Sequence, residues 1–419
     1  MPVRIHSRLN YSCLRKSAAT VLLSQSIPFS PGYLPDFFGQ FPAASAVFVL
    51  RGADESAEPY VSKTSNLRKR LQRLLAPPES QSKRLNLRER VTWIEYTLTG
   101  SDFESVLLLY KTLRREFPRT YQKRLRLRPA PLVRMNMDNE YPRAYVTTKI
   151  GRLNGRSTYY GPFRSKAAAE KFLNDSLDLF KMRRCTFDLN PDPKFPGCVY
   201  SEMKMCLAPC FKGCTDEAYA VEVGRVQAYL DSCGESLIHE LAAERERLSA
   251  ALDFEAAGQQ HAKVEKVKGI LSGADEIYHR LDRLDAVVIQ PSLEPKSVAL
   301  FRFAKGELSG PEHVVVESED ASESMELRLR TALKKLMPAG AHSARQFMEE
   351  LAILKRWYYR SHKVGEIIFA KDDGQFPMRK LGNAVGRVYR GERISETTKD
   401  TKENAEFTTE TRRHGEERT

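Results

Sequence analysis

The sequence is poor in the long apolar runs of membrane proteins and secretory leaders, and in the cysteines of disulfide-rich secreted proteins. Near the N-terminus the longest mostly apolar run, Ala18 to Leu23, is too short for a secretory leader, and it continues into Ser24 and Gln25 without a small-residue cleavage site. Seven cysteines in 419 residues are too few for a disulfide scaffold. We therefore expect a soluble, cytoplasmic protein with no membrane partner.

Acidic residues are also scarce relative to basic ones. Lys and Arg total 67 against 54 Asp and Glu, which gives a formal net charge of +13. Such a surplus steers a protein toward polyanions, although it says nothing about fold. Nucleic acid is therefore the leading class of partner.

The length and the pattern of the chain predict an α/β protein made of several segments, because one hydrophobic core rarely grows to this size. Large apolar residues almost disappear after Gly391, which predicts disorder there. The predicted segments are an N-terminal stretch without an assigned role (1–35), a small α/β domain (36–135), a cysteine-rich metal-binding region (136–235), an αα-hairpin (236–275), a partial α+β C-terminal region (276–390) and a disordered tail (391–419).

The small α/β domain follows from local patterns. Strand-like runs occupy 46–50, 59–61 and 92–97, and Ser101 opens a helix that continues to Glu116. Between the second and third strands, Asn66 caps a predicted helix over 67–75 whose leucines share one face and whose basic residues share the other. In the C-terminal region, 286–289, 297–303 and 313–316 predict strands, the last two joined through Lys305-Gly306.

Several motifs in this order resemble the N-terminal half of the UvrC family of bacterial excinucleases, over roughly residues 40 to 316. Phe48, Tyr60-Val-Ser-Lys63 and Asn66-Leu-Arg-Lys-Arg70 resemble its GIY-YIG nuclease motifs. Thr99 to Leu109 and Phe117 to Tyr121 resemble the helix and the R-P-R-Y-N motif that follow. Three further stretches are similar to its YFGP motif, its cysteine motif and its UVR motif. In that order they are Tyr159 to Phe163, Cys206 to Cys210 and Leu252 to Ala257.

The resemblance implies a nuclease site in the 36–135 domain. A GIY-YIG site cuts a phosphodiester with one divalent metal, a carboxylate that holds the ion, a Tyr hydroxyl and cations for the phosphate. Tyr60, Lys63 and Arg70 match the family's tyrosine, lysine and arginine. The alternative interpretation of these three residues is one strand aromatic and two solvated charges.

Four departures from the family motif predict a degenerate incision site. Phe48 lacks the hydroxyl of the first Tyr, and Ser62 replaces a Gly. Leu109 stands at the position of the metal-holding Glu, although Mg²⁺ requires hard oxygen ligands. Tyr121 replaces the family's Asn.

The alternative is an active metal-dependent endonuclease with a relocated carboxylate, and only that case needs Mg²⁺ or Mn²⁺. Glu104 is the nearest carboxylate on the same predicted helix. It lies about 140° around the helix axis from Leu109, so we expect it to face elsewhere.

Four cysteines are spaced much as in the family's iron–sulfur motif: Cys185, Cys198, Cys206 and Cys210. Four thiolates suit a 4Fe-4S cluster, which the resemblance favours. Zinc is an alternative, with Cys214 as a second choice for the fourth ligand, and free thiols remain a third interpretation. Cys13 and Cys233 stand alone, and we expect them to be ordinary buried thiols.

Basic residues dominate the stretch from Lys63 to Arg90 and a second run from Lys111 through Arg134. We expect Arg68, Lys69 and Arg73 to contact the phosphates of double-stranded DNA, which positions a protein without reading sequence. A solubilising charged face is the alternative interpretation.

The hairpin at 236–275 resembles the UVR motif, which in this family docks on the corresponding hairpin of the UvrB protein. Phe254, Glu255, Ala256 and Ala257 are the predicted contacts for a UvrB-like partner, and a purely structural hairpin is the alternative. Together these features predict a UvrC-like nucleotide excision repair protein that binds damaged duplex DNA.

Overall fold

The computed structural model describes residues 23–392, except 34, 55, 78–84, 152–154, 318–322 and 342. Within these residues the fold is mixed α/β, with three antiparallel sheets of four strands and eleven α-helices, in agreement with the predicted class. None of the described helices is long and apolar enough to cross a membrane. The predictions for Cys13, Lys83, Arg84, most of 1–35 and nearly all of 391–419 lie outside the described residues.

The chain divides into two compact units. The first contains residues 1–99 and 108–118, and the second contains 100–107 and 119–419. Helix α2 (Asp102–Glu116) contributes residues to both units. The predicted boundaries at 135, 235 and 275 fall inside the second unit, and they stay predictions.

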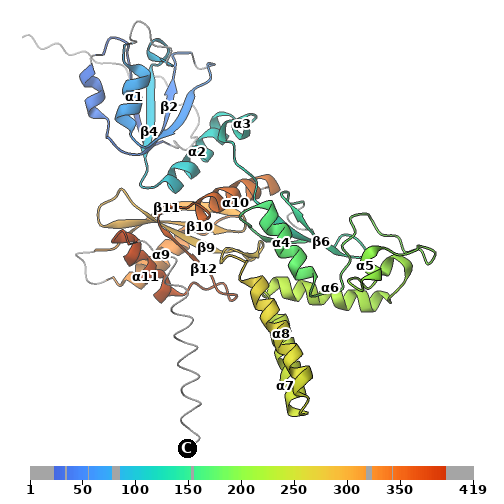
Figure 1. Cartoon of the computed structure of the whole chain (residues 1–419). Coiled ribbons are helices and arrows are strands. Elements are labelled where there is room, and N and C mark those ends of the chain that lie inside the picture. Colours follow the sequence, from blue (N-terminus) through green and yellow to red (C-terminus); the bar gives the residue numbers. More distant parts are fainter. Residues whose placement is uncertain are drawn as a thin grey trace, which may run out of the picture. The chain divides into compact units, whose positions relative to one another are not determined.

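The first unit is built on an antiparallel sheet with the order β1-β4-β2-β3 (Figure 1). Its central strand β2 is buried on both faces because its side chains alternate between two apolar clusters. Strand β1 has no counterpart among the sequence predictions. The strands are β1 (Gln25–Pro28), β2 (Ala46–Arg51), β3 (Tyr60–Thr64) and β4 (Trp93–Leu98).

Helix α1 (Leu67–Leu75) confirms the amphipathic basic helix predicted from the leucine spacing. Its N-cap residue Asn66 accepts a hydrogen bond from the backbone N–H of Lys69 at 2.9 Å. The four leucines of the helix are buried against β2, β4 and two short 3₁₀ segments, η1 (Pro35–Gln40) and η2 (Arg88–Arg90). Of the cations of α1, Lys69 and Arg73 are consequently exposed, whereas Arg68 and Arg70 are half-buried.

The second unit contains the sheet β6-β5-β7-β8. One face of this sheet packs on helices α4 and α6 through an aromatic core that includes Tyr160, Phe172, Tyr219 and Tyr278. The elements are α3 (Tyr121–Leu125), β5 (Leu132–Asn136), β6 (Arg143–Thr147), β7 (Thr158–Gly161), α4 (Lys166–Leu177), α5 (Val199–Glu202), η3 (Pro209–Phe211), α6 (Asp216–Asp231) and β8 (His279–Arg280).

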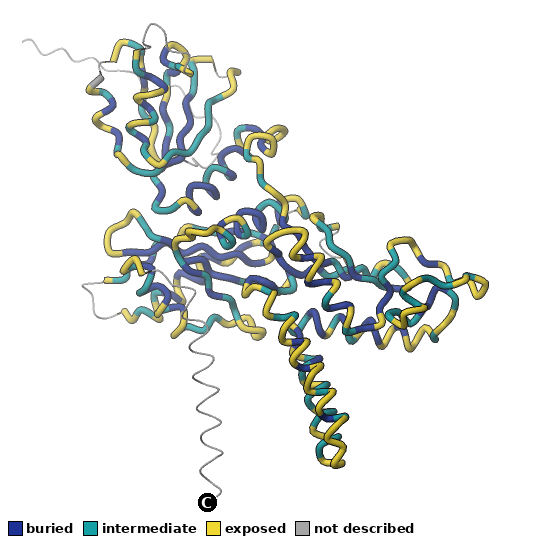
Figure 2. The backbone as a smooth tube through the Cα atoms, viewed as in Figure 1, coloured by how far each residue is buried: buried dark blue, intermediate teal, exposed yellow. Residues whose placement is uncertain are grey.

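Helices α7 (Glu235–Ala250) and α8 (Phe254–Leu271) lie along one another as a pair, at the position of the predicted hairpin (Figure 1). Asp253 caps α8 by accepting a hydrogen bond from the N–H of Ala256. Much of the pair is exposed (Figure 2), because only Leu237, Ala257, Val264 and Val267 are buried.

The third sheet, β11-β10-β9-β12, forms the C-terminal part of the second unit. Helices α9 and α11 cover one face through Val298 and Leu300, and α10 packs on the other through Phe347, whose ring meets Phe303. The predicted turn at Lys305-Gly306 is present, and both residues have positive φ. The elements are β9 (Ala286–Pro291), β10 (Ser297–Ala304), β11 (Glu307–Val315), α9 (Met325–Lys335), α10 (Ala344–Tyr358), β12 (Glu366–Phe369) and α11 (Met378–Tyr389).

Candidate functional site

Tyr60 and Arg70, two of the predicted catalytic residues, are in direct contact. A terminal guanidinium nitrogen of Arg70 donates a hydrogen bond to the Tyr60 hydroxyl at 2.7 Å, and the ring of Phe48 lies 6.1 Å from that of Tyr60. The Nε atom of Arg70 is buried and has no hydrogen-bond partner within the part of the chain that the structure describes. A buried donor of this kind is costly, so an acceptor from outside the chain would stabilise it. A phosphate oxygen suits it well, because guanidinium groups bind phosphates through several donors.

The other predicted nuclease residues are divided between the two faces of the sheet. Strand register places Ser62 opposite Phe48, on the face of Tyr60, and Lys63 opposite Val47, on the reverse face. Leu109 packs on the reverse face with Val47, Val49 and Val61. Strand β3 forms the edge of the sheet.

Two carboxylates of the first unit, Glu95 and Glu116, are already engaged by cations. Arg51 on β2 donates to Glu95 at 2.8 Å and to Glu116 at 2.9 Å. Burial alone would raise the pKa of Glu116, but hydrogen bonds from Arg51 and Arg115 lower it below its usual value. Glu104, in the second unit, accepts a hydrogen bond from the Gly100 N–H at 2.8 Å, and burial raises its pKa.

Of the predicted DNA contacts, Lys69 and Arg73 are exposed on α1. Arg68 is half-buried, and its Nε donates to the carbonyl of Phe41 at 2.7 Å. Arg88, also in the basic stretch, is buried and donates to the carbonyls of Leu75 and Pro31, so it braces the fold. The free positive charge of α1 therefore comes mainly from Lys69 and Arg73.

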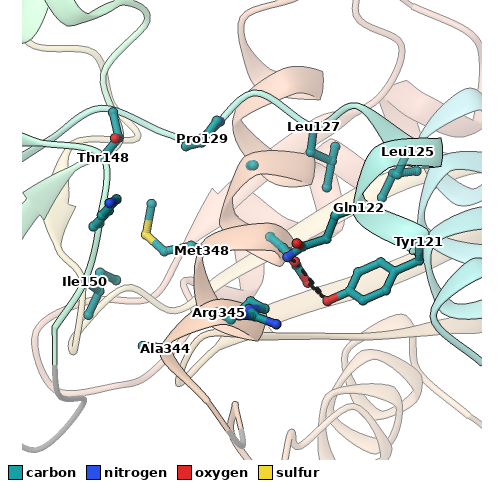
Figure 3. Close-up of a pocket in the computed structure, with 13 residues that line it drawn as sticks. Tyr121, Gln122, Leu125, Leu127, Pro129, Thr148, Ile150, Ala344, Arg345 and Met348 are labelled. Carbon is teal, nitrogen blue, oxygen red and sulfur yellow. Dashed lines mark hydrogen bonds between the residues drawn. The ribbon is translucent and has the colours of Figure 1, made fainter. Parts of the chain in front are cut away.

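Tyr121 has a partner that the sequence did not indicate. Its hydroxyl donates to both carboxylate oxygens of Glu349 on α10, each at 2.9 Å (Figure 3). The amide of Gln122 donates to the same carboxylate at 2.5 Å. Glu349 is 228 residues away along the chain, so no local pattern could have revealed this cluster.

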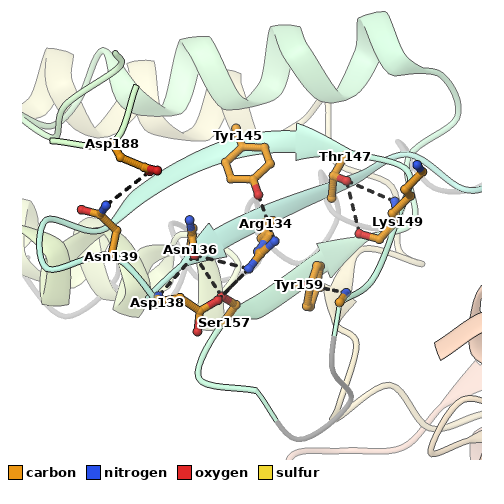
Figure 4. Close-up of polar contacts among 11 residues, drawn as sticks. Arg134, Asn136, Asp138, Asn139, Tyr145, Thr147, Lys149, Ser157, Tyr159 and Asp188 are labelled. Carbon is orange, nitrogen blue, oxygen red and sulfur yellow. Dashed lines mark hydrogen bonds and ion pairs between the residues drawn. The ribbon is translucent and has the colours of Figure 1, made fainter. Parts of the chain in front are cut away.

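Arg134, at the end of the second basic run, is engaged by its own sheet through its terminal nitrogens, although its Nε has no hydrogen-bond partner among the described residues. Its guanidinium donates to Tyr145, Asp138 and Ser157 at 3.0, 2.7 and 3.0 Å, and it lies over the rings of Tyr145 and Tyr159 at 5.7 and 5.6 Å (Figure 4). These contacts span β5, β6 and β7. Arg134 therefore organises this face of the sheet rather than offering a free charge.

The four predicted metal-binding cysteines lie near one another around α5 and η3. Burial, followed by the charges of Cys185, Cys210 and Cys198, raises the pKa of Cys206 to about 11 despite an opposing hydrogen bond from the Ala208 N–H. Among the described residues, no group of three or more His, Cys, Asp or Glu side chains already has metal-binding geometry. The positive charge of a bound ion or cluster would relieve the repulsion among four thiolates.

Arg183 braces the loop that carries the first of these cysteines. The side chain is only 1% exposed, and its guanidinium donates to the carbonyls of Tyr141 and Phe187, each at 2.9 Å. It also donates to the sulfur of Cys185 at 3.3 Å. A donor to sulfur stabilises the thiolate form, which is the form that binds metals. The only signal in the sequence was that Arg183 precedes Cys185 by two residues.

The tip of the α7–α8 pair exposes two large apolar residues. Leu252 is 73% exposed and Phe254 is 67% exposed, while Glu255 is also on the surface. Ala257 is buried and Ala256 is half-buried, so of the four predicted partner contacts these two face the hairpin itself.

A family model for the middle domain of UvrC/Cho excinucleases matches residues 130–229, from the start of the β5 sheet to the end of α6. Curated proteins named UvrABC system protein C are similar over most of the chain. The one from Methanothermobacter thermautotrophicus is 25% identical over 322 residues, 76% of this chain and 53% of its own length. These matches support a UvrC-family protein.

Two further curated proteins named UvrABC system protein C are also similar to this chain. The protein from Ruminiclostridium cellulolyticum is 25% identical and covers 71% of this chain and 48% of its own length. That from Actinobacillus succinogenes is 29% identical over 55% of this chain and 37% of its own length. The chain spans about half the length of the UvrC proteins it matches first. No solved structure matches it.

Proposed function

We propose that this chain is a nucleotide excision repair protein that binds damaged duplex DNA with its first unit and carries a degenerate GIY-YIG incision site. The observation that carries the proposal is the Tyr60–Arg70 pair, with its buried, unpartnered Nε donor. This pair offers one hydroxyl and several guanidinium donors at one point, which suits a phosphodiester oxygen.

The residues at the expected metal position support the proposed degenerate state. At the position of the family's metal-holding Glu, Leu109 packs its side chain against Val47 and Val49. Arg51 pairs with Glu95 and Glu116, and Arg115 pairs with Glu116 as well, so both carboxylates are already engaged by cations. A hydrolytic site without a metal ligand loses charge neutralisation and the activation of water together.

The cysteine region is proposed to hold an iron–sulfur cluster on Cys185, Cys198, Cys206 and Cys210, with zinc as the alternative ion. The N–H donors of Arg183 and Ala208 to sulfur atoms fit thiolate ligands. When bound, such a group links the segments around α5 and η3 and neutralises the thiolates.

The α7–α8 pair is proposed as the contact for a UvrB-like partner. Leu252 and Phe254 are exposed at its tip, where a soluble protein gains nothing from large apolar side chains unless another surface covers them. Phe254→Ala should weaken binding to such a partner, while Val221→Ala, an exposed apolar residue on α6, serves as the control.

The decisive experiment compares binding and incision on the same lesion-bearing duplex in Mg²⁺ or Mn²⁺. We expect submicromolar to micromolar binding, weakened about tenfold by Arg70→Ala and less by Arg70→Lys, with incision no faster than in the absence of metal. Efficient metal-dependent incision by the natural sequence would overturn the degenerate site. Binding that Arg70→Ala leaves unchanged would remove the Tyr60–Arg70 pair from the interface.

A further inference from the structure

A pocket of about 590 Å³ lies in the second unit, bounded by α3, the segment that leads into β5, the end of β6 and helix α10 (Figure 3). This volume is typical of sites for small molecules and single cofactor groups. None of the nuclease, cysteine or hairpin residues discussed above lines it, apart from Tyr121.

The polar end of the pocket is fixed by hydrogen bonds. Tyr121 and Gln122 both donate to the Glu349 carboxylate, at 2.9 and 2.5 Å. Arg345, one turn before Glu349 on α10, lines the same pocket. An amide, a carboxylate and a guanidinium at one end can read a ligand edge that carries both hydrogen-bond donors and acceptors.

The wall formed by the end of α3 and the residues after it alternates between apolar and basic residues. Leu125, Leu127 and Pro129 line the pocket, whereas Arg124, Arg126 and Arg128 are exposed. Residues 119–134 include six cations and no acid. The wall therefore offers apolar surface inside and a row of positive charge outside, a pairing that suits a flat apolar ring attached to an anionic backbone.

We propose that this pocket receives the base of one unpaired nucleotide in DNA, while the outer arginines hold the flanking phosphates. The proposal rests on the DNA-repair function proposed above. A nucleobase has two apolar faces, which Leu125, Leu127 and Met348 can contact, and an edge of donors and acceptors, which Gln122, Glu349 and Arg345 can read. Tyr121, which replaces the family's Asn, then has a role in this pocket, because its hydroxyl orients the Glu349 carboxylate.

The test uses a duplex with a single bulged 2-aminopurine and the same duplex with that base paired. The full-length chain should bind the bulged duplex at least tenfold more tightly, and binding should shield the bulged base from quenching by acrylamide. Free 2-aminopurine deoxynucleotide should bind far more weakly than the bulged duplex, because it lacks the flanking phosphates.

Variants separate the pocket from the charged wall. Leu127→Trp fills the pocket from its wall, and Thr148→Trp fills it from the exposed rim without disturbing a core, so both should abolish the preference for the bulge. Arg126→Ala should weaken binding to both duplexes alike. Val221→Trp on α6 and Arg330→Ala on α9 are the matched controls and should change neither affinity nor preference.

Each other outcome overturns a defined claim. Equal binding of bulged and paired duplexes, or a preference that survives in the folded Thr148→Trp variant, overturns the base pocket while leaving the proposed DNA-repair function intact. Free deoxynucleotide that binds as tightly as the bulged duplex assigns the pocket to a soluble nucleotide and overturns the DNA assignment. Absence of binding to any duplex overturns the proposed function itself.

Discussion

At the scale of single residues, position 109 decides whether the first unit can hold a divalent metal. Leu109 is half-buried on the reverse face of the sheet, beside Val61 of the edge strand β3. We predict that Leu109→Glu, alone or with Phe48→Tyr, raises metal-dependent incision at least tenfold, which is about 1.4 kcal/mol of barrier, because a hard oxygen ligand is restored. A nicking assay measures the change.

The matched control for this prediction is Leu109→Gln, which has the same shape as the Glu variant without its charge. Gln should bring no gain in incision. If the natural chain already cuts DNA and Leu109→Glu slows it, the carboxylate has relocated and the site is not degenerate.

Also at the residue scale, Glu116 should make stability depend on pH. Its pKa is lower in the folded chain than its ordinary value of 4.5, so its contribution is fully present above that value and is lost as pH falls through the lower folded pKa. Glu116→Gln should destabilise the chain by about 1 to 2 kcal/mol at pH 7 and by almost nothing well below pH 4. Urea unfolding at both pH values tests the sign.

The comparison for Glu116→Gln is Glu326→Gln, which breaks an exposed pair with Arg330 on α9. That change should cost less than about 0.5 kcal/mol at either pH. An equal effect of the two substitutions would show that the Arg51 network adds nothing beyond a surface ion pair.

At the scale of secondary-structure elements, helix α8 contains a glycine, Gly258, whose replacement should make the helix more stable. Gly258 is exposed, and a Cβ atom added there would meet no atom within 4 Å. Gly258→Ala should therefore stabilise the hairpin by about 1 kcal/mol, the usual difference in helix propensity. Gly306→Ala is the opposite case, because its φ is +76° and the new Cβ would lie 1.9 Å from Phe347, so it should destabilise the chain. Thermal unfolding distinguishes the two.

The cysteine segment makes a second prediction at this scale. Protein prepared without oxygen should be brown, with the broad visible absorbance of an iron–sulfur cluster, and Cys206→Ser should remove the colour. Cys233→Ser should retain it, because Cys233 is outside the group of four. One zinc ion per chain without iron would contradict the cluster and favour the alternative.

The elements themselves were largely predictable, because their signals are local. The leucine spacing and Asn66 predicted α1, and Lys305-Gly306 predicted the turn between β10 and β11. Strand β1 escaped prediction because Gln25–Pro28 is short, mostly exposed and ends in a proline. Its pairing with β4 depends on residues about 70 positions away, which no local pattern records.

The candidate site was predictable only in part, for the same reason. The Tyr60–Arg70 contact spans ten residues and follows from a motif, whereas the bond between Tyr121 and Glu349 spans 228. The motif also gave no sign that its residues lie on two different faces of the sheet. Both Phe48 and its neighbour Val47 are fully buried, so hydrophobicity alone does not tell which face each one occupies.

At the scale of the whole molecule, the net charge of +13 should make DNA binding strongly dependent on salt. If about four phosphates are contacted, raising salt from about 50 to about 200 mM should weaken binding roughly a hundredfold. Lys69→Ala or Arg73→Ala should each lower the slope of log affinity against log salt by about 1, whereas Arg134→Ala, whose charge is paired with Asp138, should not lower it. Fluorescence anisotropy over a salt series measures this, and a flat response would contradict phosphate binding.

The alternation of apolar and basic residues from Leu125 to Pro129 limits which mutations this segment can accept. Each leucine on the inner side of that segment is adjacent to an arginine on the outer side. Substitutions that keep the polarity of each position should be accepted readily, but deletion of one residue between 126 and 128 would exchange the two sides. Arginines would then enter the pocket and leucines would face water, so the segment should vary in sequence among related chains while keeping its length.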